Sequence, residues 1–160
     1  MAGGDAFYLV VPTPQVFSHQ GDAGRRGQPY QEDLREAARQ SWRRRAVLGG
    51  DLYVRVAWFH PQPITRAEGA DLDNILKPIL DAVEGVAYDD DRAIVRCALS
   101  RHLMTETAAP QLPEAAPPWV QNKLDGLLAG FKRHYHVLYI EIGATNAFDV
   151  RLGPIDGVTA

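Results

Sequence analysis

The chain has 160 residues, 46% of them hydrophobic, which suffices for one domain with a single core and is too few to expect two. No run of about 18 apolar residues occurs and no basic-then-apolar leader opens the chain, so the sequence predicts neither a membrane span nor a secretory signal and favours a cytoplasmic protein. The net charge of −3 argues mildly against nucleic acid as a partner, although the distribution of charge matters more than its sum.

A strand and a glycine-bearing loop are predicted first along the chain. Residues 7–11 are apolar and β-prone, and Pro12 is expected to end the strand. The segment 18–29 carries three glycines, so we expect a flexible loop there.

A basic helix is predicted from residue 30 to about residue 47. Leu34, Ala38 and Trp42 recur every four residues and indicate a buried stripe. Guanidinium groups bind phosphates in a bidentate way, so we expect the neighbouring arginines to contact DNA: Arg25, Arg26, Arg35, Arg39, Arg43, Arg44 and Arg45. A solvated helix face partly balanced by nearby glutamates explains the same pattern equally well.

The remaining elements alternate in type. Apolar alternation predicts strands at 51–59, 94–103 and 134–142, and three-and-four spacing predicts helices at 75–83 and 119–131. Pro78 should make the first of these helices begin near Lys77 or start with an irregular turn. We expect an exposed loop at 105–118 and a frayed tail from 143. The whole chain, 1–160, is predicted to be one α+β domain with a mixed β-sheet packed against about three helices.

The acidic stretch between residues 71 and 91 is the most informative feature. Asp71-Leu-Asp-Asn-Ile-Leu-Lys77 is followed by Asp81 and by Asp89-Asp-Asp91. Crowded acids repel one another, and proteins usually keep them together around a divalent cation. Oxygen-rich sites suit Mg²⁺ or Mn²⁺. The stretch therefore predicts a metal-dependent nuclease.

Convergence of the two acidic patches is the geometric requirement. Asp71 and Asp73 share one side only if the backbone there is extended, with Asp73 as the N-cap candidate. Alternatively, both acids merely cap the helix and favour its positive end. A helix of about 12 residues spans only about 18 Å, so Asp90 and Asp91 can return beside them. Such a group could hold one or two cations about 3.5–4 Å apart, while Lys77 neutralises the phosphate.

The ordered pattern of Asp71-x-Asp-Asn-x-x-Lys77, Asp81-Ala and Asp90-Asp-x-x-Ile94 resembles the RusA family of Holliday-junction resolvases, most strongly over about residues 53–102. The resemblance implies that Asp71, Asp73 and Asp91 are the catalytic aspartates. The essential lysine falls on Lys77, and Asp90 matches a neighbouring acid that we count among the metal ligands. The resemblance further implies an α+β homodimer that uses Mg²⁺, for which Mn²⁺ could substitute, to cut four-way DNA junctions in recombination and repair.

Two other functional classes stay open. A phosphotransferase with an Asp-x-Asp nucleophile would need an apolar strand leading into Asp71, and residues 66–70 do not supply one. A DNA-binding or scaffold protein that keeps the fold with an impaired site is compatible with the low overall charge.

Several other residues are expected to be structural. The five histidines lack metal-ligand spacing, so no zinc site is predicted. Trp42, Trp58 and Trp119 lie on apolar stripes and are expected in the core or in dimer contacts, rather than as base-stacking platforms. Cys97 is expected to be a small buried side chain in its strand.

Overall fold

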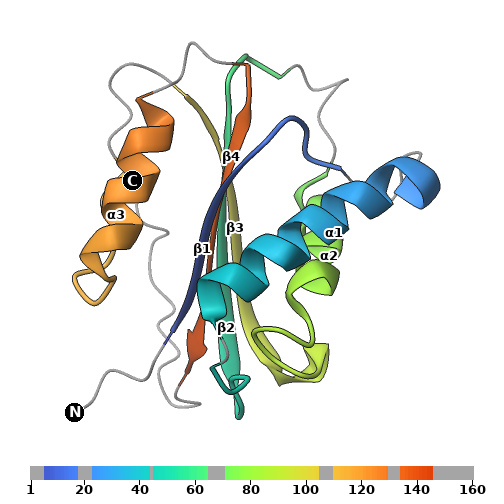
Figure 1. The fold of residues 1–160 in the computed structure, drawn as a ribbon, viewed down its shortest axis with the longest axis vertical. Coiled ribbons are helices and arrows are strands. Elements are labelled where there is room, and N and C mark those ends of the chain that lie inside the picture. The colour runs from blue at the N-terminus through green and yellow to red at the C-terminus, as the bar shows by residue number, and fades with distance from the viewer. Residues whose placement is uncertain are drawn as a thin grey trace, which may run out of the picture.

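The computed structural model describes residues 6–17, 23–43, 45–64, 71–104, 110–129 and 134–145, without the side chains of 23–26. A mixed four-stranded sheet forms the centre of this part of the chain (Figure 1). Its strands lie in the order β1 (Phe7–Thr13), β4 (His136–Ala144), β2 (Leu52–His60) and β3 (Ile94–Leu103). β4 is antiparallel to both neighbours, and β3 is parallel to β2.

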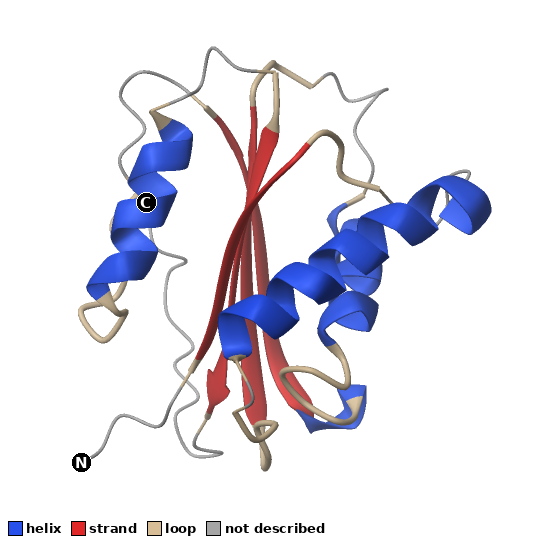
Figure 2. Ribbon diagram, viewed as in Figure 1, coloured by secondary structure: helices blue, strands red, loops and turns tan. Residues whose placement is uncertain are grey.

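Helices cover both faces of the sheet, as Figure 2 shows. α1 (Ala23–Trp42) and α2 (Leu72–Val83) lie on one face, and α3 (Pro118–Leu128) lies on the other, against β1 and β4. The α+β class, with a mixed sheet and three helices, is confirmed. No helix in the described part of the chain is both long and apolar enough to cross a membrane.

Two apolar clusters follow from alternation along the strands, since successive side chains of a strand point to opposite faces. On β2, Leu52, Val54, Val56 and Trp58 pack toward α1 and α2. Phe59 packs into the second cluster, beneath α3. The α1 stripe predicted from four-residue spacing is buried as expected, with Tyr30 added to it.

β1 continues through Pro12 instead of ending there. Pro12 pairs in register with Val137 of β4, and β1 is an edge strand. A proline lacks only the N–H group, which on an edge strand can face away from the sheet. The prediction that Pro12 ends the strand was therefore wrong.

α1 begins seven residues before the predicted start and ends five before the predicted end. Residues 23–29 are helical although they were predicted to be loop. Tertiary packing overrides the low helix propensity of glycine and proline here, since Tyr30 is buried and its ring lies 5.4 Å from Phe17. Arg43 ends the helix by adopting a left-handed backbone, with φ of 33°. The rest of the predicted loop, 18–22, lies outside the described residues.

The C-terminal half follows the predicted order with shifted bounds. β4 runs through Gly143 to Ala144, so the tail predicted from 143 begins later; residues 146–160 lie outside the description. Residues 110–117 contain neither helix nor strand, as predicted, and 105–109 are not described. β3 has the predicted bounds, but its side chains are mostly exposed, and Cys97 is exposed rather than buried. β3 is an edge strand that α2 covers only in part, so that Ile94 and Leu99 are half-buried while most of its side chains are exposed.

Candidate active site

α2 carries the charged residues of the site on its solvent-facing side. Its apolar residues, among them Ile75, Ile79 and Val83, are buried against the sheet, which leaves the opposite side free for charge. Asp73, Lys77 and Asp81 recur every four residues and therefore lie along one stripe. The helix thus presents a carboxylate, an ammonium group and a second carboxylate along one stripe.

The start of α2 differs from the prediction. The helix begins at Leu72, so Asp71 is the N-cap and Asp73 lies within the first turn. Only Asp71 has an extended backbone, with φ −61° and ψ 141°, and its side chain makes no capping hydrogen bond. Pro78 lies inside the helix and is buried. Asp73 is therefore not the N-cap, and of the two alternatives predicted for Pro78 a helix starting near Lys77 is wrong, because a helical turn that includes the buried Ile75 precedes Pro78.

Lys77 joins α2 to the second acidic patch. Its Nζ donates to Asp81 Oδ1 at 2.6 Å and to Asp91 Oδ2 at 3.0 Å. The hydrogen bonds to Asp81 and then to Asp91 raise the pKa of Lys77 well above its ordinary value. The side chain is therefore an ammonium ion at any physiological pH, and it cannot act as a general base.

A tight reversal after α2 brings Asp91 back. Gly85 has a φ of 76°, which glycine adopts without the steric cost that a Cβ imposes. The chain then returns to the short helix η1 (Asp91–Ala93), whose first residue is Asp91. Asp91 returns to α2 as predicted, but beside Lys77 and Asp81 rather than beside Asp71 and Asp73.

Tyr88 positions Asp91 from beneath. Its buried hydroxyl donates to Asp91 Oδ1 at 2.8 Å, with the carbonyl oxygen of Leu80 at 3.1 Å as a second acceptor. Burial, followed by the hydrogen bond to Asp91, raises the pKa of Tyr88, so the phenol keeps its proton. Sequence reasoning missed this residue, for which a lone aromatic beside a run of acids was the only signal.

Three carboxylates come close enough together to hold a cation. Asp81, Glu84 and Asp91 each offer an oxygen, and these oxygens lie within 4.8 Å of one another. All three are half-buried at the edge of α2. Carboxylate oxygens are the donors that Mg²⁺ and Mn²⁺ prefer, so the donor set fits such an ion. Glu84 was not a sequence candidate, because its role depends on the turn that follows it.

The other predicted acids lie outside this cluster among the described residues. Asp71 and Asp73 are exposed at the start of α2, with Asp73 one turn before Lys77. Asp90 turns to Arg92, which donates to it from both its backbone and its side chain. These bonds lower the pKa of Asp90 to about 2, so it stays ionised. Asp90 is therefore paired with the Arg92 guanidinium rather than with the cluster.

The arginines of α1 fall into three groups. Arg35 donates to the carbonyl oxygens of Asp81 at 2.6 Å and Ala82 at 3.2 Å, so it fastens α1 to the last turn of α2. Arg39 is exposed and lies 3.8 Å from Glu36. Arg43 and Arg45 lie just beyond the C-terminal end of the helix and line a cleft. The side chains of the other predicted DNA contacts, Arg25, Arg26 and Arg44, lie outside the described residues.

The site thus sets a lysine ammonium among half-buried carboxylates at the surface of an α+β fold. The sequence profile of the family described as endodeoxyribonuclease RusA matches residues 15–111. That span contains α1, β2, α2, the acidic cluster and β3, and the chain belongs to this family of nucleases. Among curated proteins, none matches the sequence.

Proposed function

We propose that this protein is a Mg²⁺-dependent endonuclease that cuts four-way DNA junctions. The observation that carries the proposal is the Lys77 ammonium held between Asp81 and Asp91, with Glu84 beside them. Membership of the RusA family supports DNA as the substrate. Junction cleavage, a role in recombination and repair and a cytoplasmic location are further parts of the same proposal.

The cation would be held by Asp81, Glu84 and Asp91, with Asp71 and Asp73 as the further carboxylates that the family resemblance implies. When bound, Mg²⁺, or Mn²⁺ in its place, would polarise the phosphodiester and make water a stronger nucleophile. The protein itself supplies orientation and charge. Tyr88 fixes one oxygen of Asp91, and Lys77 offers a permanent positive charge to the phosphate as negative charge develops on it.

Pairing of two copies is part of the proposal, because a junction presents paired strands. β3 offers a surface for it: this long edge strand exposes Val95 (56%) and Leu103 (39%). Exposed edges with free backbone groups are templates for pairing with another chain. Sedimentation should therefore give twice the chain mass. A double change, Val95→Lys with Leu103→Lys, should give single chains, and a wild-type mass of one chain would refute this part.

The central test is cleavage of a labelled four-way junction and of a linear duplex, with Mg²⁺ and with chelator. Lys77→Met and Asp91→Asn should each lower the junction cleavage rate by about 10²- to 10³-fold, as expected when a group that stabilises developing charge is removed. Glu114→Gln changes an exposed carboxylate near α3 and serves as the matched control. Cleavage that survives chelator and both substitutions would overturn the assignment.

The same assay can separate the two sets of acids. Glu84→Gln removes a member of the observed cluster, whereas Asp71→Asn and Asp73→Asn remove acids that the structure leaves outside it. Titration calorimetry with Mg²⁺ alone should show weaker binding for Glu84→Gln. If only the Asp71 and Asp73 variants weaken binding, the ion is held nearer the start of α2.

One observation favours a second candidate function. Asp71 and Asp73 lie outside the compact cluster, which is the arrangement expected of a protein that keeps the fold and binds DNA without cutting it. Junction binding with no Mg²⁺-dependent cleavage by the wild type would support this alternative.

A further inference from the structure

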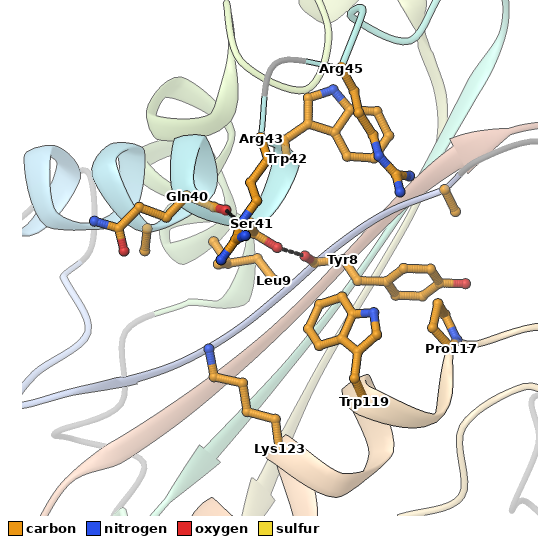
Figure 3. A pocket seen from close by; sticks show the side chains of 12 residues that line it. Tyr8, Leu9, Gln40, Ser41, Trp42, Arg43, Arg45, Pro117, Trp119 and Lys123 are labelled. Carbon is orange, nitrogen blue, oxygen red and sulfur yellow. Dashed lines mark hydrogen bonds between the residues drawn. The ribbon is translucent and has the colours of Figure 1, made fainter.

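A cleft of about 490 Å³ opens at the edge of the molecule that is farthest from β3 in strand order. It lies between the C-terminal end of α1 and the start of α3, with β1 between them (Figure 3). Its volume falls within the range of pockets that take small ligands. The carboxylate cluster lies elsewhere, where η1 leads into β3. The cleft is therefore a separate feature that the proposed chemistry does not use.

Positive charge dominates this cleft. Arg43 and Arg45 follow the C-terminal end of α1, and Lys123 lies in α3. In Figure 3 the side chains of Arg43 and Lys123 extend toward one another across β1. No carboxylate occurs among the described residues that line the cleft. Arg43 and Lys123, which no carboxylate of the described lining separates, match an anion such as a phosphate.

An exposed aromatic ring lies beside these charges. Trp119 is 47% exposed, whereas Trp42 and Trp58 are buried, so Trp42 and Trp58 belong to the core and a dimer contact for Trp119 stays a prediction. Figure 3 shows the Trp119 indole next to Tyr8, on the side of the cleft opposite Arg45. Arg45 itself lies over the ring of Trp42, 5.2 Å from its centroid. Aromatic rings next to cations form the usual platform for unpaired bases.

Arg43 adds a third observation, because its backbone is left-handed at the position where helices usually end with glycine. A side chain there carries a steric cost, and such costs often persist where the side chain has a function. Arg43 holds its guanidinium at the mouth of the cleft, and its Nε donates to the carbonyl oxygen of Gln40.

We infer that this cleft binds an unpaired nucleotide of a DNA strand, with the base stacked on Trp119 and the flanking phosphates on Arg43 and Lys123. The inference rests on the proposed function, because it names a second contact for the same DNA substrate. It places one strand across the β1 edge while the carboxylates act beside β3.

Binding of a fluorescent single-stranded oligonucleotide, measured by anisotropy in chelator, tests this inference without cleavage. Trp119→Leu should weaken binding by about 5- to 150-fold, the range found when a stacking ring is removed, and Trp119→Phe should retain most of it. Lys123→Gln should reduce the slope of log K against log salt by about 0.7, whereas Lys123→Arg should keep the slope. Arg43→Gly should weaken binding while the melting temperature stays equal or rises, because glycine relieves the left-handed backbone.

Unchanged affinity and slope in the Trp119→Leu and Lys123→Gln variants would overturn the inference. Equal binding of duplex and single strand, with equal losses in the variants, would also overturn it, since the occupant would then not be an unpaired base. If polyglutamate displaced the labelled oligonucleotide at the same concentration as unlabelled oligonucleotide does, the inference would be overturned and an acidic protein identified as the occupant instead. If the wild type binds as expected but never cuts a junction, the proposed function fails and this inference stands.

Discussion

Lys77 places its positive charge between the carboxylates of Asp81 and Asp91, within 2.6 Å of the first and 3.0 Å of the second. The three side chains are between a third and a half exposed, so solvent screens their attraction and each ion pair contributes little to global stability. Their value lies in local order: a charge that sits in a fixed place before the substrate arrives needs no reorganisation during the reaction.

The raised pKa of Lys77 sets the pH dependence. A group whose pKa is higher in the folded protein stabilises the fold fully at any pH below its ordinary pKa, about 10.4 for lysine. That stabilisation is lost as the pH rises through the raised pKa. Junction cleavage at saturating Mg²⁺ should therefore not decline between pH 7 and about 9.5 on account of Lys77. A decline near pH 8 that disappears in Lys77→Met would contradict this prediction.

Two buried tyrosines form a matched pair for a stability test. The Tyr88 hydroxyl bonds Asp91, whereas the Tyr30 hydroxyl is buried without a partner among the described residues. Tyr88→Phe should lower the free energy of unfolding by about 1 kcal/mol, and Tyr30→Phe should leave it unchanged or raise it. Urea denaturation measures both. In the junction assay, Tyr88→Phe should also slow cleavage, because one oxygen of Asp91 loses its anchor. Equal effects of the two changes on stability would refute the role given to Tyr88.

At the scale of elements, Arg35 connects α1 to the last turn of α2 rather than facing solvent. Arg35→Met should destabilise the fold by about 1.5–3 kcal/mol, because two hydrogen bonds from a charged group are lost. It should leave the salt dependence of DNA binding unaltered, whereas Arg39→Gln should flatten that dependence if exposed arginines of α1 contact phosphates. A flattened slope for Arg35→Met would instead return Arg35 to the DNA-binding set.

The pairing of β2 with β4 contains a close approach at Gly143. A Cβ on Gly143 would lie 2.8 Å from the ring of Tyr53, whose hydroxyl donates to the buried Glu141. Gly143→Ala should cost about 1–3 kcal/mol, since overpacking would push Tyr53 off that acid. Gly126→Ala is the control: this helical position has open space and should gain about 0.5–1 kcal/mol. Thermal melts that rank the two variants in the opposite order would refute the packing argument.

Elements with regular apolar spacing were predictable, but the ends of most of them were not. β3 is the exception: it has the bounds that its sequence pattern predicted. α1 starts early because Tyr30 packs against Phe17, a residue distant in sequence. β1 continues through Pro12 because it is an edge strand of the sheet. Neither fact is encoded in local spacing. The exposure of Trp119 was likewise hidden, since an apolar stripe does not reveal whether another element will cover it.

The site was predictable only where a motif held the signal. Lys77 and Asp91 were candidates from sequence, and the structure brings them within hydrogen-bonding distance. Glu84 and Tyr88 flank a turn whose shape depends on the left-handed backbone of Gly85, and no periodicity announces such a turn. Asp71 and Asp73 were expected in the same cluster, but α2 begins early enough to leave them one or more turns away from it.

For the molecule as a whole, two charged sites lie at opposite edges of the sheet. The net charge is −3, yet Asp81, Glu84 and Asp91 gather with Lys77 near β3, while Arg43, Arg45 and Lys123 line the cleft beside β1. A cationic cleft of this kind can orient an approaching polyanion before contact. It also explains why overall charge was a poor guide to the partner.

The position of β3 has one further consequence. Asp91 sits in η1 immediately before this strand, which pairs with β2 alone and has little side-chain cover. Segments of this kind open most readily, so their amide hydrogens exchange with deuterium fastest. A ligand that fastens Asp91 to α2 would restrain the strand as well, and isotope uptake along β3 would report on cation loading even when no DNA is present.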